Sequence, residues 1–216
     1  MYRFIFFSVL SLFTCSVYSA PETQGSALDE LVESLNRIKT LSATFVQYSV
    51  DQRGARIQES KGELKADRAG KFFWRTYEPL EQIVISDGKE VTVYDPDLEQ
   101  ATIQAVGSQV QTTPAILFSG DTQKIGQLFE VEMAWFEPSI RQFTLKPKSE
   151  ESLFEGLKLR FSGSNVSELR ITDALGQEST MSFIQSQVNL ELPSNTFTPE
   201  LPEGTDIIRD VQIPGS

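Results

Sequence analysis

The chain has 216 residues, a formal net charge of −11, one cysteine and no histidine. The absence of histidine excludes a Ser-His-Asp triad, a Cys-His pair and most catalytic zinc sites, which rely on imidazole. The acidic balance disfavours binding to nucleic acid and to anionic lipid headgroups, so we expect no nucleic-acid partner.

Residues 1–19 are typical of a secretory signal peptide. Arg3 supplies a positive start, and the apolar run over residues 4–13 is too short to span a bilayer. Cleavage after residue 19 or 20 removes Arg3, the one charged residue among the first twenty, so the net charge goes from −11 to −12. We expect Cys15 to leave with this peptide. The mature chain, residues 20–216, would then be a single soluble domain without a disulfide.

Residues 26–38 predict an amphipathic helix. Ser26 and Asp29 have the spacing of a capping box at its start. Apolar residues recur every three or four positions, at Leu28, Leu31, Val32, Leu35 and Ile38. One face of this helix should therefore lie on an apolar partner.

From residue 41 the apolar period changes to two, which predicts β-strands. We expect strands over residues 43–50, 56–67, 71–77, 81–86, 89–94 and 98–105. Asp87-Gly88 is typical of a two-residue hairpin loop. That loop would place Val84 opposite Val91.

The alternation is absent between residues 109 and 118. Thr113-Pro114 predicts the start of a short helix that ends at Gly120, and residues 121–128 predict another. Strands resume over residues 129–135, 141–146, 156–162, 168–173 and 177–187. The proline-rich tail from residue 192 should wrap the surface in extended form. The pattern indicates a mainly β (α+β) fold, one antiparallel sheet of about eleven strands that curls over one or two helices.

Residues 61–113 carry more apolar side chains than one face of a sheet requires. Phe72-Phe73-Trp74 and Ile83-Val84-Ile85 break the alternation that strands with one solvated face normally show. Parts of both faces should therefore be covered by something apolar. A protein core, a helix or a bound lipid would each serve.

Several segments resemble, in chain order, the periplasmic outer-membrane lipoprotein carrier family, LolA. They are residues 43–47 (ATFVQ), 68–74 (RAGKFFW), 86–89 (SDGK), 93–100 (VYDPDLEQ), 113–115 (TPA), 119–120 (SG), 143–148 (FTLKPK) and 197–199 (FTP), with Gly204. Ala69 stands where the family motif usually has proline. The resemblance runs from the first helix to the tail.

The resemblance implies an unclosed β-barrel of eleven strands, with helices forming a lid over an apolar cavity. It implies a monomeric periplasmic carrier, not an enzyme, without cofactor or metal. Such a carrier takes triacylated lipoproteins from an inner-membrane ABC-type releasing complex and delivers them to an outer-membrane receptor. Each acyl CH₂ contributes about 0.8 kcal/mol to membrane retention, so a chain of about fifteen methylenes is held by roughly 12 kcal/mol. Crossing an aqueous gap therefore requires a protein cavity.

The resemblance also assigns Arg68 the role of a latch. Its guanidinium would hydrogen-bond backbone carbonyls of the lid and hold the cavity closed until lipid enters. The alternative is an exposed turn arginine. The lid would use Leu31, Leu35 and Ile38 from the first helix, and Pro114, Ile116, Leu117 and Phe118 from the second.

Five further residues are candidates for the acyl-chain cavity and its mouth. They are Phe72, Trp74, Val84, Val91 and Val93. Phe72 would lie at the mouth by resemblance, and Trp74 shares its strand parity. For these side chains, as for the apolar lid residues, the alternative is permanent core packing. Ile83, Ile85 and Tyr94 fit the description of cavity residues equally well.

Three other functions fit parts of the sequence. The outer-membrane receptor of the same fold is itself a lipoprotein, so retention and acylation of Cys15 would favour it. A carrier of another amphiphile, such as a glycolipid, would use the same kind of cavity. A carboxylate-based periplasmic hydrolase would require two positioned acids. The clustered Asp95, Asp97 and Glu99 lack the glycine and distant glutamate of a calcium loop, and they predict a solvated turn.

Overall fold

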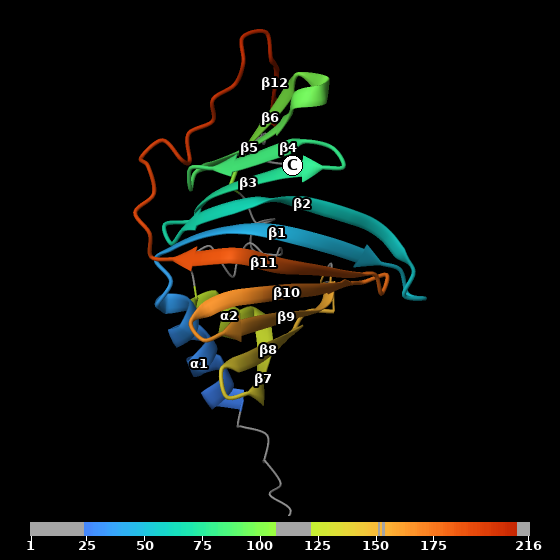
Figure 1. Cartoon of the computed structure of the whole chain (residues 1–216), viewed down its shortest axis with the longest axis vertical. Coiled ribbons are helices and arrows are strands. Elements are labelled where there is room, and N and C mark those ends of the chain that lie inside the picture. The colour runs from blue at the N-terminus through green and yellow to red at the C-terminus, as the bar shows by residue number, and fades with distance from the viewer. Residues whose placement is uncertain (1–23, 107–121, 151, 153, 211–216) are drawn as a thin grey trace, which may run out of the picture.

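In the part of the chain that the structure describes, twelve strands form one open sheet, and two α-helices lie on one side of it (Figure 1). The computed structural model describes residues 24–106, 122–150, 152 and 154–210. The strand order is β12-β6-β5-β4-β3-β2-β1-β11-β10-β9-β8-β7, so β12 and β7 form the two edges. Within the described residues these edges do not join. The arrangement confirms the mainly β fold and the unclosed barrel.

The helices are α1 (Gln24–Asn36) and α2 (Gln123–Leu128), with a 3-10 turn η1 (Pro96–Leu98). The strands are β1 (Thr40–Val50), β2 (Arg56–Asp67), β3 (Lys71–Glu78), β4 (Gln82–Ser86), β5 (Glu90–Asp95), β6 (Gln100–Ala105), β7 (Phe129–Glu137), β8 (Ile140–Pro147), β9 (Phe154–Ser162), β10 (Asn165–Asp173), β11 (Glu178–Val188) and β12 (Asp206–Asp210). All neighbours pair antiparallel except β12, which runs parallel to β6.

The strand β12 is the one strand that the periodicity did not predict. It lies in the tail from residue 192, which we expected to wrap the surface in extended form. A turn over residues 202–205, with Gly204 at φ +92°, reverses the chain so that it meets the edge of β6. The amide of Asp206 then donates to the carbonyl of Glu99 at 2.8 Å, and the parallel ladder follows.

The helix α1 begins and ends two residues earlier than the sequence predicted. Ser26 therefore lies inside the first turn and is not the N-cap, and Ile38 lies beyond the helix. The apolar stripe reports which face is buried, whereas the helix end depends on distant side chains. Asn189 donates its side-chain amide to the carbonyl of Arg37 at 3.0 Å, directly after the last helical residue.

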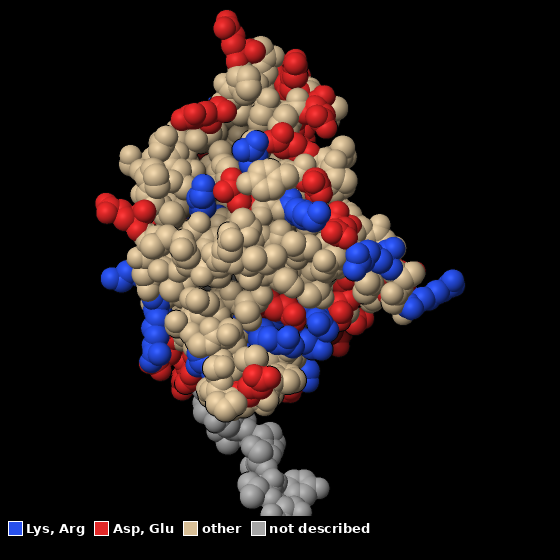
Figure 2. All heavy atoms as spheres, in the orientation of Figure 1, with Lys and Arg blue, Asp and Glu red and all other residues tan. Residues whose placement is uncertain are grey.

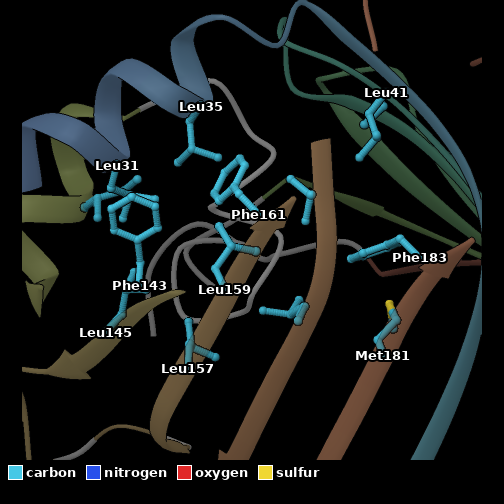
Figure 3. Close-up of a cluster of buried hydrophobic side chains, with 14 of the residues drawn as sticks. Leu31, Leu35, Leu41, Phe143, Leu145, Leu157, Leu159, Phe161, Met181 and Phe183 are labelled. Atoms are coloured by element: carbon cyan, nitrogen blue, oxygen red, sulfur yellow. The ribbon is translucent and has the colours of Figure 1, made fainter. Parts of the chain in front are cut away.

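The main core lies between α1 and the side of the sheet that α1 covers, here called the inner face. Figure 3 shows Leu31 and Leu35 of α1 pointing toward Phe143, Leu159 and Phe161. The rings of Phe143 and Phe161 meet edge to face, with centroids 5.7 Å apart, and neither ring is exposed. These contacts are the favoured aromatic geometry. Burial of α1 on β7–β9 fixes which side of each strand is apolar.

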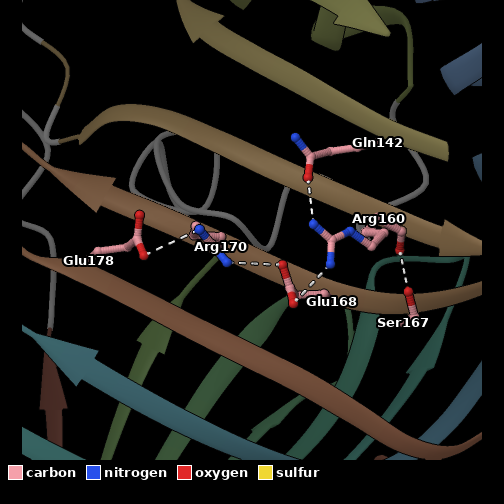
Figure 4. Close-up of polar contacts among 6 residues, drawn as sticks. All are labelled: Gln142, Arg160, Ser167, Glu168, Arg170 and Glu178. Atoms are coloured by element: carbon pink, nitrogen blue, oxygen red, sulfur yellow. Dashed lines mark hydrogen bonds and ion pairs between the residues drawn. The ribbon is translucent and has the colours of Figure 1, made fainter. Parts of the chain in front are cut away.

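The opposite, outer face of β8–β11 carries a ladder of charged side chains (Figure 4). Arg160 donates to Gln142 at 2.9 Å and lies 3.4 Å from Glu168. Arg170 lies 3.5 Å from Glu168 and 3.4 Å from Glu178. The clean alternation of apolar and charged residues in these strands thus corresponds to a core side and a solvent side.

The outer face of β3–β5 is instead covered by the tail, which runs from β11 to β12 (Figure 1). A pocket of about 350 Å³ lies between them, and both strands and tail line it. Its sheet side includes Phe73, Ile83, Ile85 and Tyr94. Within the tail, Phe197 is 8% exposed. The broken alternation in β3 and β4 therefore has a structural cause, since apolar residues are needed on both faces.

Exposed acidic side chains gather at the β6 and β12 end of the molecule (Figure 2). This group includes Asp97, Glu99, Glu203 and Asp206. Asp95 accepts a hydrogen bond from Gln82 at 2.8 Å. The acids beside η1 form the solvated turn that the sequence predicted, and no cluster of three or more metal-ligating side chains occurs in the described part of the chain.

Candidate functional site

The inner face of β3–β5 presents all five residues predicted for the acyl-chain site. Cross-strand pairing aligns Leu64, Trp74, Val84 and Val93 in one row across β2–β5. A second row aligns Ala66, Phe72, Ser86 and Val91. Leu64 and Ala66 belong to the main core, and Phe72 and Trp74 pack against it. We call Phe72, Trp74, Val84, Val91 and Val93 the apolar wall.

The three competing residues lie on the other side of the sheet. Ile83, Ile85 and Tyr94 alternate with wall residues along β4 and β5, so they point to the outer face and line the pocket beneath the tail. Strand parity thus separates two groups that composition alone could not distinguish.

The β4–β5 hairpin has a different register from the predicted one. Val84 pairs with Val93, and Val91 pairs with Ser86. The cause is Asp87, whose carboxylate accepts hydrogen bonds from the amides of Lys89 and Glu90, both at 2.8 Å. These bonds hold residues 87–89 in a loop between the strands, in place of the predicted two-residue loop. The register moves by two residues, so every side chain keeps its predicted face.

The hydrogen bonds of this loop also affect the acidity of Asp87. The backbone amide of Glu90 and then that of Lys89 stabilise the carboxylate and hold the pKa of Asp87 below its usual value of 3.8. The negative charge of Asp87 therefore stabilises this loop, and the loop sets the pairing of Val84 with Val93 in the wall.

Trp74 connects the wall to the core. Its ring centroid lies 4.6 Å from that of Phe45, and its indole N–H donates to Thr76 at 3.3 Å. Phe45 has room for this contact because position 62 is glycine. A Cβ at Gly62 would lie 2.6 Å from Phe45 Cζ and 2.0 Å from the carbonyl oxygen of Arg75. The close packing at Gly62 thus allows Phe45 to support Trp74 of the wall.

The wall residues differ from the core residues in how much of them is covered. Phe72, Trp74, Val84 and Val93 are half-buried, and Val91 is 7% exposed. Half-buried aromatic and branched side chains on a concave sheet offer apolar surface that a ligand could still cover.

The predicted lid residues of the first helix lie over the inner face. Leu31 is fully buried and Leu35 nearly so, and Ile38 packs against the same core from the segment after the helix. The remaining predicted lid residues, Pro114, Ile116, Leu117 and Phe118, lie outside the described residues, as do Cys15 and the predicted signal peptide. Gly126 of α2 approaches Leu28, so α1 and α2 touch.

Arg68 lies in the turn between β2 and β3 and contacts the last residue of α1. Its guanidinium donates to the carbonyl oxygen of Asn36 and to the side-chain oxygen of the same residue. That side-chain oxygen also accepts a hydrogen bond from Thr122, directly before α2, at 3.1 Å. A carbonyl at a helix end lacks an intrahelical partner, so a guanidinium satisfies it well. Asn36 thereby joins the turn, α1 and α2.

Sequence reasoning missed Asn36 and also Arg141. Arg141 shares strand parity with Phe143 and Leu145, so it is a charge on the apolar side of β8. That parity was the signal that could have found it. Asn36 gave no such signal, because its role depends on a helix end that the periodicity placed two residues late.

Comparisons with known proteins find relatives over nearly the whole chain. The profile of the family described as outer membrane lipoprotein carrier protein LolA matches residues 36–200. An outer-membrane lipoprotein carrier protein of Pseudomonas putida (strain GB-1) is 35% identical over 96% of this chain and 98% of its own length. One of Hahella chejuensis (strain KCTC 2396) is 38% identical over 94% of this chain and 98% of its own.

A solved structure shares the fold. An uncharacterized conserved protein from Thermus thermophilus aligns with a TM-score of 0.57 and 14% identity, over 87% of this chain and 100% of the other. In the part of the chain that the structure describes, no helix has the length and apolarity that crossing a membrane requires.

Proposed function

Because this chain belongs to the LolA family of outer membrane lipoprotein carrier proteins, we propose that it carries lipoproteins through the periplasm with their acyl chains on the apolar wall. The observation that supports this best is the wall itself. Four of its five side chains are half-buried on the inner face, beside a helix that covers the same face. Acyl chains need such apolar cover to leave a membrane.

The position of the wall fits a reversible binding site. Its two rows continue directly from Leu64 and Ala66, so bound chains would extend the existing core. Displacing α1 from the inner face would uncover further apolar side chains, including Leu31 and Leu35. A site that is closed by protein when empty and by lipid when loaded exposes little apolar surface in either state.

Arg68 is the proposed latch of this site. Its bonds to Asn36 hold the C-terminal end of α1, and through Thr122 they also reach the start of α2. Breaking them weakens the hold on Asn36, the residue through which the ends of both helices are joined. Arg68→Leu should weaken closure and slow the handover of bound lipoprotein.

We also propose the direction of transport. The carrier receives triacylated lipoproteins from an inner-membrane ABC-type releasing complex and passes them to an outer-membrane receptor, acting as a monomer. Residues 1–19 would direct its export. The intact mass of the periplasmic protein tests the last point, since retention of an acylated Cys15 would instead identify the receptor.

A release assay tests the function. Inner-membrane vesicles with the releasing complex, ATP and a labelled triacylated lipoprotein are incubated with the mature chain, and the soluble fraction is analysed by native mass spectrometry. A soluble one-to-one complex is expected. Lipoprotein that stays in the membrane, with an active releasing complex, would contradict the proposal and favour the receptor or a carrier of another amphiphile.

Two variants sharpen the assay. Phe72→Glu places a charge in the wall and should prevent loading without unfolding the protein. Arg68→Leu should load but hand over slowly. Arg37→Leu is its matched control, because Arg37 follows Asn36 directly yet its guanidinium pairs with Glu33 on the surface. If Arg68→Leu hands over lipoprotein at the normal rate, Arg68 is not the latch.

A further inference from the structure

A charged pair lies on the inner face, away from the apolar wall. Arg141 of β8 and Glu30 of α1 form it, and the Arg141 side chain is 12% exposed while that of Glu30 is 38% exposed. On the same side of β8, Phe143 and Leu145 are fully buried. An arginine in this position is unusual, because burial of a charge costs free energy unless the charge is paired and hydrogen-bonded.

The surroundings of Arg141 satisfy its guanidinium from several elements. One terminal nitrogen donates to the carboxylate of Glu30, and the other donates to the carbonyl of Gly163 at 3.1 Å. The centre of the guanidinium lies 5.5 Å from the ring of Trp135 and 5.6 Å from that of Phe161. Both rings are within the range of a cation–π contact. Three of these four partners belong to the sheet and its turns, and only Glu30 belongs to α1.

This division has a consequence for α1. When α1 lies on the sheet, every contact of Arg141 is made at once. If the N-terminal half of α1 moves away, Arg141 loses its counter-charge, while its carbonyl and ring partners stay with the sheet. Separating a partly buried charge from its partner is unfavourable. Lifting this half of α1 is therefore penalised through an ion pair, whereas the polar contacts at the C-terminal end are hydrogen bonds of Arg68 to Asn36 and of Asn189 to the carbonyl of Arg37.

We propose that the Arg141–Glu30 pair is a tether that keeps the N-terminal half of α1 on the sheet, so that α1 opens from its C-terminal end. The two arginines act on points six residues apart, Glu30 and Asn36, or about 9 Å along a helix. Arg68 then controls whether α1 opens, and Arg141 controls where it pivots. This inference rests on the proposed function in one respect, since it assumes that α1 moves when lipid binds.

Hydrogen exchange of the α1 amides, measured by mass spectrometry on the mature protein without lipid, tests the tether directly. Arg141→Leu should accelerate exchange of amides 28–32 by about tenfold, as expected when a local opening loses one partly buried ion pair. Arg68→Leu should accelerate exchange at residues 33–38 instead. Equal acceleration along all of α1 in both variants would contradict a pivot.

Arg160→Leu is the matched control for Arg141→Leu. Arg160 is also a partly buried arginine of a neighbouring strand, with a carboxylate partner and an aromatic ring, Phe136, at 5.3 Å. It faces outward, so its loss should leave exchange of α1 unchanged. Acceleration of α1 in Arg160→Leu equal to that in Arg141→Leu would overturn the tether.

A second variant covers the case in which Arg141→Leu unfolds. Glu30→Ala removes the partner from α1 and leaves the sheet intact, and alanine raises helix propensity. Faster exchange at amides 28–32 would then reflect the lost tether and not a weaker helix. Glu33→Ala is its control, because Glu33 pairs with exposed Arg37. Unchanged exchange in Glu30→Ala would refute the proposal.

The lipid-free readout separates this inference from the carrier function. If the exchange pattern is as expected but the release assay fails, the tether stands and the carrier proposal falls. If release succeeds while Arg141→Leu and Glu30→Ala exchange like the wild type, the carrier stands and the tether falls.

Discussion

The two halves of the sheet use their faces in opposite ways. In β7–β11 the inner side chains, such as Phe143 and Leu159, are fully buried, and the outer face carries the charged ladder through Arg160 and Glu168. In β3–β5 the inner side chains of the wall remain mostly half-buried, and the outer face lies under the tail. The first half is therefore a completed core, and the second half has its apolar surplus on the side where a ligand would lie.

This difference separates stability from binding within one sheet. Inner residues such as Phe143 and Leu159 have no exposed surface, so changing them should affect folding first. Residues of the wall are mostly less buried, so changing them should affect loading first. The tail lines the outer face of β3–β5, and their inner face is incompletely covered. The following variants test this division, in order of decreasing effect on stability.

Phe143→Ala should have the largest effect, because it removes the edge-to-face partner of Phe161 and leaves a cavity that the surrounding strands cannot fill. We expect a loss of about 3–5 kcal/mol in the free energy of unfolding. Urea denaturation followed by circular dichroism measures it. A loss below that of Phe72→Ala would reverse the comparison between the halves.

Phe197→Ala tests the cover on the outer face. The ring is buried in the tail, but a tail can settle onto the sheet more easily than a strand can move, so a loss of about 2–3 kcal/mol is expected. Lipoprotein loading should stay at the wild-type level in the release assay at a temperature where the variant is folded. Impaired loading under that condition would show that the outer face contributes to binding.

Phe72→Ala should cost only about 1 kcal/mol of stability, because Phe72 is already partly exposed. Loading of lipoprotein should nevertheless fall several-fold, since a large part of the wall is lost. Urea midpoints and the release assay on the same preparation give both numbers. A large loss of stability with normal loading would make Phe72 a core residue.

The smallest effect concerns Asp87 and pH. Its pKa is depressed in the folded state, so its contribution to stability is present above the unfolded value near 3.8 and is lost as the pH falls through the folded value. Asp87→Asn keeps the shape and removes the charge. The wild type should therefore have a higher urea midpoint than this variant at pH 7, and the gap should close below pH 3.8. A gap independent of pH would rule out the charge as its cause.

Periodicity predicted most of the fold because strands and helices bury one face in a regular pattern. It placed Phe72 and Trp74 on the correct side, and parity is insensitive to the two-residue error in the β4–β5 loop. The register itself depended on which amides the Asp87 carboxylate accepts, and the turn motif does not specify that. The resemblance pointed to Arg68, but its partner Asn36 depended on where α1 ends.

Other features that the sequence could not supply involve distant segments. The pairing of β12 with β6 joins residues 206–210 to residues 100–104, and no local pattern encodes it. Arg141 was visible as a misplaced charge, but its partner Glu30 lies 111 residues away. Local physics determines elements and faces, whereas long-range contacts determine which unusual residues meet.

The position of β1 in the middle of the sheet has a consequence for the order of assembly. Its neighbours are β2, the next strand, and β11, which lies about 140 residues further along the chain. A chain that emerges N-terminus first can pair β1–β6 early, but the centre of the sheet stays open until residue 188 has emerged. Contacts so distant in sequence form slowly because a long loop must close first. The nascent chain therefore presents β1 as a free edge, and shielding that strand is a requirement of its biogenesis.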